Sequence, residues 1–370
     1  MSAVPPAPPL PWRVCGAGPV ALAFALFLVR RGVPAARIAV EPPPDLDAVP
    51  PPALAARTLA LSHGSRQLLE RIVVMPQAGA IERVDISMLG HAGRTRIVAG
   101  ELGVPALGHV VRYGPLWAAL RRAAHACRWA NPADPAADGA DRLIVHAEGD
   151  TGEDARVREF DQSALLGEVV ARHAPSSLHT SAFERFTPDG PLALLPLPEP
   201  SRWAMVWCDR AERCAARVTA DRGGLAAALQ ARFGDSLGTL ELDGPLVTAP
   251  LVRRARRRIV RDGEVWIGNA AQTLHPVAGQ GLNLGLRDAY ELAEALVPVA
   301  LRGAPLQPAL VAWQRARQLD RTITIGLTDL MAASFTWPLA APIQSPVLAA
   351  LDAIEPLRRP LARQLMFGRR

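Results

Sequence analysis

The sequence predicts an α/β protein with a Rossmann-like dinucleotide-binding domain, an inserted β-sheet domain and a helical C-terminal region. Near the N-terminus, Gly16 and Gly18 lie between an apolar strand and an apolar helix, the order found in dinucleotide-binding domains. A second strand, Gly-rich turn and helix follow at 265–296. Between Ile81 and Ala99, alternating polar and apolar residues predict strands of a separate sheet.

The composition narrows the classes of function. The 370 residues can form two or three domains, and a hydrophobic content of 49% excludes global disorder. All 41 basic residues are arginine and the net charge is +6, but only 5% of the residues are aromatic and no base-stacking or zinc-finger pattern occurs. We therefore expect no nucleic-acid partner. The positive net charge instead predicts a weak attraction to anionic lipid.

The cysteines and histidines indicate no metal site. Four cysteines occur without a Cys-x-x-Cys pair or the spacing of a disulfide framework, and no His-Glu-x-x-His or Gly-x-Ser-x-Gly motif is present. These patterns fit a reducing cytoplasm and predict neither metal-dependent nor acyl-transfer chemistry.

The apolar stretch from Val14 to Gly32 predicts a strand, a tight turn and a helix. It is not read as a signal peptide because Gly-Ala-Gly-Pro interrupts it, and it is too short to span a membrane. Gly16 allows the turn, Gly18 allows close approach of a pyrophosphate, and Ala21 takes the third small position where helix and strand meet. Glu41 ends the next strand, where a carboxylate would accept hydrogen bonds from an adenosine ribose.

The run from Ile267 to Asp288, IGNAAQTLHPVAGQGLNLGLRD, is the most informative part of the chain. Gly279 and Gly281 leave no Cβ in the way of a flat ligand, and Pro276 stiffens the approach to them. The helix N-terminus that begins there has free backbone N–H groups and a positive dipole end, which stabilise negative charge. An ordinary helix-capping loop is the alternative for a lone Gly-x-Gly.

This run resembles the second flavin-binding motif of the para-hydroxybenzoate hydroxylase class, usually Gly-Asp-Ala-Ala-His followed by Pro and Gly-Gln-Gly-x-Asn-x-Gly. Asn269 stands at the usual Asp and Gln272 at the usual His, a version similar to that of the ubiquinone-biosynthesis hydroxylases that act on 2-polyprenyl-6-methoxyphenol. The resemblance implies FAD as cofactor and places Pro276, Gly281 and Leu282 at its reacting edge. The implied cofactor-binding residues are Gly16, Gly18, Ala21, Glu41, Arg57, Asn269, Gly279, Gln280, Gly281, Leu282 and Asn283.

Arg57 is included among these residues because it belongs to the run ARTLALSHGSRQLLERI. This run resembles the Arg-x-x-Ala-Leu segment that follows the dinucleotide fold in the family. By that resemblance Arg57 lies near the flavin. A solvated arginine at a helix end is the alternative.

A substrate pocket is expected from residues 160–210, where FDQSALLGEVVA, FERFTPDGPLALLPLP and RWAMVWC predict three antiparallel strands. Phe-Glu-Arg-Phe-x-x-x-Gly-Pro-Leu-Ala-x-Leu-Pro is characteristic of the ubiquinone branch. The resemblance implies that the backbone of one segment lies over the reacting ring, namely Gly190, Pro191 and Leu192. Phe183, Phe186, Leu194 and Leu195 would line an apolar pocket that excludes water, although any one aromatic here is more often plain core.

One segment departs from the family. Where relatives carry Ala-Asp-Gly-x-x-Ser-x-x-Arg, a motif that touches the pyrophosphate and is linked to nicotinamide use, this chain has Glu148 in place of the Asp and no Ser after it. The departure favours one alternative, a catalytically weak FAD-binding structural partner in a quinone-synthesis assembly. Another alternative is a flavoprotein of different chemistry, such as a halogenase or prenyl reductase, although the Trp-x-Trp-x-Ile-Pro of halogenases is absent.

The resemblance implies an FAD-dependent monooxygenase that hydroxylates a polyprenylated phenol with dioxygen through a flavin hydroperoxide, with NAD(P)H as reductant. The expected domains are a discontinuous FAD-binding domain (12–75, 107–156 and 246–298), a substrate-binding β-sheet domain (76–106 and 157–245) and a C-terminal helical region (299–370).

The end of the chain is basic and amphipathic. It either packs on the core or docks on an anionic membrane, which would place a cytoplasmic protein at the inner face of that membrane. The residues concerned are Arg358, Arg359, Arg363, Arg369 and Arg370 beside Leu357, Leu361, Leu365, Met366 and Phe367.

Overall fold

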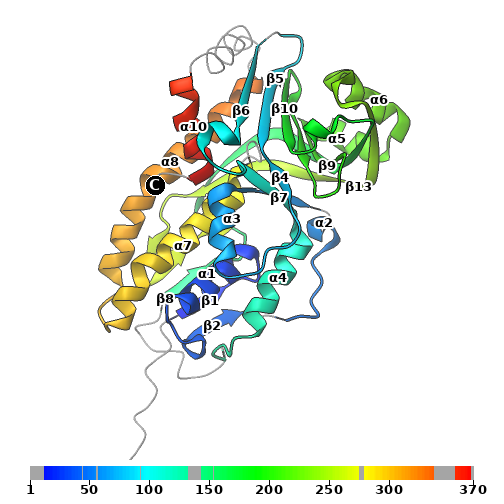
Figure 1. Ribbon diagram of the computed structural model, residues 1–370. Helices are drawn as coiled ribbons and strands as arrows, with labels where there is room; N and C mark the ends of the chain where they lie inside the picture. Colours follow the sequence, from blue (N-terminus) through cyan, green and yellow to red (C-terminus); the bar gives the residue numbers. More distant parts are fainter. Residues whose placement is uncertain are drawn as a thin grey trace, which may run out of the picture.

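A computed structural model describes residues 12–43, 45–55, 57–91, 93–131, 143–152, 154–274, 279–336 and 355–367. It contains a five-stranded, an eight-stranded and a three-stranded sheet (Figure 1). The mixed α/β architecture confirms the predicted fold class. The domain boundaries stay a prediction.

The five-stranded sheet is the Rossmann-like part of the molecule. Its strand order is β14-β15-β8-β1-β2, and all neighbouring pairs except β14 with β15 are parallel. The strands are β1 (Trp12–Cys15), β2 (Ile38–Glu41), β8 (Leu143–His146), β14 (Val260–Arg261) and β15 (Glu264–Trp266). The carboxyl ends of β1 and β8 are adjacent, because Cys15 pairs with His146. Ligands bind at this edge in such sheets.

Three helices pack around this sheet: α1 (Pro19–Arg30), α4 (Tyr113–His125) and α7 (Gln280–Leu301). Helix α1 is apolar along nearly its whole length, and every residue from Ala21 to Leu28 is buried. It lies against both α4 and α7. The two predicted strand–turn–helix units, although far apart in the chain, therefore meet in one core.

The eight-stranded sheet has the order β16-β13-β9-β12-β11-β10-β5-β6. The segment expected to form three strands forms four, because FERFTPDGPLALLPLP is a hairpin in which Thr187 pairs with Gly190. Pro188 and Asp189 form its turn, as Pro and Asp favour. The strands are β5 (Arg83–Met88), β6 (Arg94–Val98), β9 (Ala155–Arg172), β10 (Ser181–Thr187), β11 (Gly190–Pro196), β12 (Arg202–Arg210), β13 (Thr239–Arg256) and β16 (Gln272–Thr273).

The two faces of this sheet have different partners. One face packs against α5 (Ala211–Thr219) and α6 (Arg222–Phe233) around a cluster that includes Leu192, Leu194 and Trp207. The opposite face points toward β3 and the N-terminus of α7 and forms a wall of the cavity described below. Side chains alternate between faces along each strand, so every second residue reaches that cavity.

The third sheet joins the two others. It pairs β3 (Thr58–Ser62) and β4 (Gly79–Ile81) antiparallel to the central strand β7 (Gly108–Arg112). Two short helices flank β3, namely α2 (Pro52–Ala55) and α3 (His63–Glu70). Ser62 caps α3, since its side chain accepts a hydrogen bond from the backbone N–H of Ser65.

The C-terminal region is helical, as expected. Helix α8 (Gln307–Thr336) runs beside α7, and α10 (Glu355–Phe367) contacts α3 and β3 (Figure 1). Ala362 and Met366 are buried in a cluster with Ile81 and Leu107, so this part of α10 covers the core. No helix within the described ranges is long and apolar enough to cross a membrane.

Several residues of the predicted amphipathic end cannot be placed. Arg369, Arg370 and the side chains of Leu357, Arg358, Leu361 and Leu365 lie outside the described residues. Arg359 and Arg363 are exposed.

Candidate functional site

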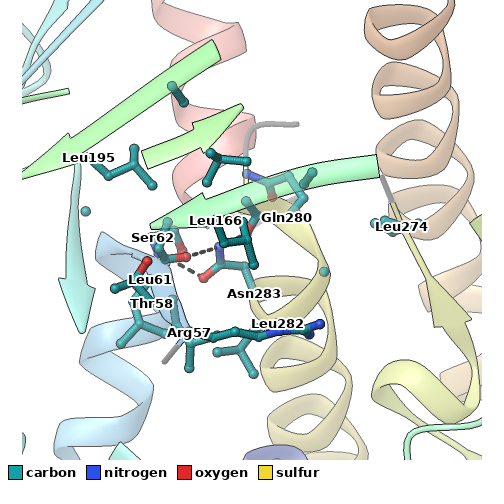
Figure 2. A pocket seen from close by; sticks show the side chains of 18 of the residues that line it. Arg57, Thr58, Leu61, Ser62, Leu166, Leu195, Leu274, Gln280, Leu282 and Asn283 are labelled. Carbon is teal, nitrogen blue, oxygen red and sulfur yellow. Dashed lines mark hydrogen bonds between the residues drawn. The ribbon is translucent and has the colours of Figure 1, made fainter. Parts of the chain in front are cut away.

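A cavity of about 680 Å³ lies between the eight-stranded sheet, β3 and the N-terminus of α7. Its size falls within the range of ligand-binding pockets. Figure 2 shows Leu166 and Leu195 entering it from the large sheet, with Thr58, Leu61 and Ser62 from β3 and Leu282 and Asn283 from α7. Segments that are far apart in the sequence therefore build one site.

The β1–α1 turn uses its two glycines differently. Gly16 has φ +124°, and a Cβ on it would lie 2.5 Å from the carbonyl oxygen of Ala147. A Cβ on Gly18 would meet nothing within 4 Å, and Gly18 lines the cavity. The loop between them is held by Trp117, whose Nε1 donates to the carbonyl of Ala17 at 2.6 Å. Gly16 thus packs closely against the backbone of Ala147, whereas Gly18 faces the cavity.

Three predicted residues of the dinucleotide motif, Gly16, Ala21 and Glu41, are not in the cavity lining. Ala21, on α1, is fully buried in the core, which fits a small residue at a helix–strand contact. Glu41 ends β2, where its carboxylate accepts a hydrogen bond from Arg13 Nε at 2.8 Å. It is 28% exposed and still has lone pairs for a further donor.

The second glycine turn lies at the start of α7. Gly279 is the N-cap, with φ +58°, and a Cβ on it would come within 3.0 Å of the Ala60 side chain. Gly281 has open space around a would-be Cβ and lines the cavity together with Gln280 and Leu282. The first-turn N–H groups of this helix point a positive partial charge at the same space. Pro276 lies outside the described residues.

Asn283 lines the cavity, but its side chain is used within the protein. Its Oδ1 accepts from the backbone N–H of Ser62 at 2.8 Å, and its Nδ2 donates to the carbonyls of Ala60 and Gly279 at 2.9 and 2.7 Å. The side chain therefore ties α7 to β3 rather than offering its amide to a ligand. Its predicted cofactor role stays a prediction.

The two departures from the family motif have different surroundings. Asn269 is exposed at the cavity lining, where its amide can meet a ligand. Gln272 is 1% exposed; its Nε2 donates to Asp288 at 2.8 Å and its Oε1 accepts from Arg321 Nε at 2.6 Å. Gln272 is thus a structural link from β16 to α7 and α8.

Arg57, just before β3, and Glu148, just after β8, bring charge to the cavity lining. Figure 2 shows the Arg57 side chain extended beside Leu282, and its buried Nε has no hydrogen-bond partner. The Glu148 carboxylate lies 2.8 Å from His146 Nδ1, and this hydrogen bond is the largest cause of the raised pKa of His146. Arg57 therefore offers an unpaired donor, as an anionic ligand requires.

These features fit FAD. Gly18 and Gly281 leave open space where a Cβ would obstruct a flat or phosphorylated ligand, and both border one cavity. The α7 N-terminus and the unpaired Arg57 Nε supply positive charge, and Asn269 supplies an exposed amide. The individual ligand roles of these residues stay predictions.

The predicted substrate residues are divided between the two faces of the large sheet. Phe183, Pro191 and Leu195 belong to the cavity lining. Leu192 and Leu194 are fully buried on the opposite face, in the cluster with α6, because they alternate with Pro191, Ala193 and Leu195 along β11. The expectation that the Leu194 side chain lines the pocket is therefore wrong, and the Leu192 side chain does not reach the pocket either.

Phe186 and Gly190 also lie outside the cavity lining. Gly190 has φ +148°, and a Cβ on it would lie 2.6 Å from the Cys208 carbonyl oxygen, so it is needed for packing of β11 on β12.

The lining contains residues that the sequence analysis did not single out. They share the cavity face of the large sheet and could have been found from the hairpin register together with strand alternation. They include Ile86, Ala164, Leu166, Ala182, Glu184, Ala193, Val206 and Cys208.

Comparison with known proteins identifies relatives. A family model described as FAD binding domain matches residues 136–318. Ubiquinone hydroxylase UbiL of Rhodospirillum rubrum is 33% identical over 236 residues, 61% of this chain and 54% of that protein. The 3-demethoxyubiquinol 3-hydroxylase of Escherichia coli is 35% identical over 183 residues, 48% of this chain and 45% of that protein. Both matches span about half the length of the relative.

Among solved structures, the flavin-dependent brominase Bmp2 superposes with a TM-score of 0.72 at 14% identity, covering 97% of this chain and 94% of that chain. At this identity the likeness shows the fold alone. The chain thus shares the fold of that protein along nearly its whole length.

Proposed function

We propose that the chain is an FAD-dependent hydroxylase of the para-hydroxybenzoate hydroxylase class and that it hydroxylates a polyprenylated phenol in ubiquinone biosynthesis. The observation that carries the proposal is the cavity itself. On its proposed cofactor side, glycines leave space for a ligand and positive charge is present. The opposite wall is the apolar face of the large sheet. A ring held between these two sides would lie next to the flavin.

Bound FAD, once reduced, would activate dioxygen and supply one oxygen atom to the ring. The protein has three tasks around that chemistry. The α7 N-terminus at Gly281 and Leu282 stabilises negative charge on the ring edge placed against it. The turn at Gly18 accommodates the pyrophosphate. Apolar side chains such as Leu166 and Leu195 exclude water, which protects a reactive oxygen species and orients the substrate.

NAD(P)H is the proposed reductant, by resemblance to the family. Glu148 and Gly149 border the cavity at the position of the family's Asp-Gly pair. A glutamate keeps the negative charge of that aspartate, so its electrostatic contribution is retained.

The test begins with the visible spectrum of the purified protein, which should show bound FAD. Oxygen uptake is then measured with NADH or NADPH and a short-chain polyprenylphenol, and the product is analysed by mass spectrometry for one added oxygen atom. Uptake that yields only hydrogen peroxide, or a flavin-loaded protein that forms no hydroxylated product with either reductant, would contradict the proposal and favour a structural role.

We also propose that the protein is cytoplasmic and docks peripherally on the inner face of the membrane, because a polyprenylphenol partitions into the bilayer. Arg359 and Arg363 are exposed on α10, whose buried residues Ala362 and Met366 border the cavity. Each arginine near anionic lipid adds about 1 kcal/mol of attraction. A docked α10 would therefore bring the cavity close to the lipid.

Vesicle co-sedimentation can test this docking. Arg363→Glu should weaken salt-sensitive binding to anionic vesicles, whereas Arg261→Glu, at an exposed arginine on the edge strand β14, should not. Equal vesicle binding by both variants, or no vesicle binding by the unaltered protein, would contradict the proposed membrane docking. FAD content should be unchanged in both variants.

A further inference from the structure

Glu184 lies in the middle of the apolar cavity wall. Across five neighbouring strands the register aligns one row of residues, in which Glu184 pairs with Ile86 on β5 and with Ala193 on β11. Ala193 pairs in turn with Val206, and Val206 with Leu166. Directly opposed residues share a face, and all five belong to the cavity lining. The row therefore holds four apolar side chains and one carboxyl group.

The other charged residues of the lining come from different segments. Arg57 precedes β3 and Glu148 follows β8, both on the cofactor side. Arg185, next to Glu184 in the chain, points to the opposite sheet face, where its guanidinium donates to the Arg232 carbonyl at 2.7 Å and to Ser87 Oγ at 3.1 Å. Among the residues that the structure describes, none forms a hydrogen bond or ion pair with the Glu184 carboxylate.

An unpaired carboxylate in an apolar wall is costly unless a ligand supplies a donor. Burial raises the pKa of Glu184 from 4.5 to about 7, so near neutral pH the group can either accept or release a proton. A ligand with its own carboxylate or phosphate would be repelled at this position. A neutral ligand with an O–H group would instead satisfy the carboxylate.

We propose that Glu184 is the residue that binds the phenolic O–H of the substrate and accepts its proton, so that the site takes neutral phenols and rejects aromatic acids. In this step the substrate O–H bond breaks, its electron pair stays on the phenolic oxygen, and the proton joins a carboxylate oxygen of Glu184. The electron-rich ring that results is the better nucleophile toward an electrophilic oxygen. This inference rests on the proposed function, since the phenol is the substrate class named there.

The experiment compares 4-nonylphenol, which has an O–H donor, with its methyl ether, which has none. Calorimetric titration into the oxidised, FAD-loaded protein measures both affinities from pH 5.5 to 8.5 without reductant or turnover. An alkylphenol, like tyrosine, ionises only near about pH 10, so pH changes in this range report on the protein. At pH 8.5 the phenol should bind about tenfold more tightly than the ether, as a hydrogen bond to a charged group implies.

This preference should fall several-fold as pH drops through the range in which Glu184 becomes protonated. Glu184→Gln should show a small preference that does not change with pH, because an amide accepts a hydrogen bond but does not titrate. Glu82→Gln is the matched control; it removes an exposed carboxylate next to β5 and should behave like the unaltered protein. If Glu184→Gln does not fold, the pH series on the unaltered protein is sufficient.

Two outcomes separate this inference from the function on which it rests. Tight binding of both ligands with no preference, or a preference that is independent of pH in the unaltered protein, would overturn the role of Glu184 alone. Failure of both ligands to bind at any pH would overturn the phenol-binding function and the role of Glu184 with it.

Discussion

The side-chain oxygen of Asn283 accepts a hydrogen bond from the backbone N–H of Ser62, 2.8 Å away, and so joins the first turn of α7 to the end of β3. Asn283 is 2% exposed, and its Nδ2 group is also bonded within the protein. The side chain of Asn283, one of the implied cofactor-binding residues, is therefore a brace that positions the turn around Gly281. The exposed amide of Asn269 is the one available to a ligand.

Replacing these two asparagines should separate stability from cofactor affinity. Asn283→Ala leaves the Ser62 N–H and the Ala60 carbonyl without their partner, so the free energy of unfolding should fall by about 1–3 kcal/mol. Asn269→Leu should leave the stability of the FAD-free protein unchanged and weaken FAD binding by about 1–3 kcal/mol, while Asn269→Asp should retain FAD. Chemical denaturation and FAD titration measure the two effects. Unchanged FAD affinity in Asn269→Leu would contradict its assignment.

The two glycines of the β1–α1 turn form a second matched pair. Gly16→Ala should destabilise the FAD-free protein, because the new Cβ would lie 2.5 Å from the Ala147 carbonyl and the residue has φ +124°. Gly18→Ala should fold normally, since nothing lies within 4 Å of its Cβ, but should lose FAD because the methyl group occupies ligand space. Thermal unfolding and flavin absorbance test both. A yellow, fully loaded Gly18→Ala protein would show that the pyrophosphate lies elsewhere.

Gln272 can be tested as a structural link. Gln272→Leu leaves buried Asp288 and Arg321 each without one hydrogen bond, so the free energy of unfolding should fall by about 2–4 kcal/mol. Gln272→His, the usual residue of the family, should be tolerated above pH 7, where a neutral imidazole can both donate and accept. As pH falls through about 6.5, an imidazolium beside Arg321 becomes unfavourable and the variant should lose stability. Denaturation at pH 8 and pH 6 measures this; equal stability of both variants at both pH values would contradict the link.

The raised pKa of Glu184 predicts how stability depends on pH. Between pH 4.5 and about pH 7 the folded protein binds more protons at this group than the unfolded chain does, so Glu184 lowers stability as pH rises through that window. Glu184→Gln removes this contribution. The ligand-free variant should be more stable than the unaltered protein at pH 8, on the order of 1–3 kcal/mol, and equally stable at pH 4. A stability difference that is the same at both pH values would mean that the carboxyl group titrates normally.

Much of this protein could be predicted from local sequence. The turn at Gly16 and Gly18, the helices that follow both glycine turns, and the strands around Ile81–Ala99 depend on backbone conformation and side-chain periodicity, which short stretches of sequence encode. The family resemblance added the expectation of an FAD-dependent hydroxylase, and the family model over residues 136–318 supports its FAD-binding part.

The roles of individual side chains depended on tertiary contacts. Leu192 and Leu194 resemble Leu195 in sequence, but the pairing of β11 with β10 and β12 decides which of them reach the cavity. Asn283 became a brace only because β3, 221 residues earlier in the chain, lies within hydrogen-bond distance. Glu184 acquired an apolar environment from four other strands. Local sequence determines conformation, whereas burial, pairing and proton affinity are set by neighbours that only the folded chain brings together.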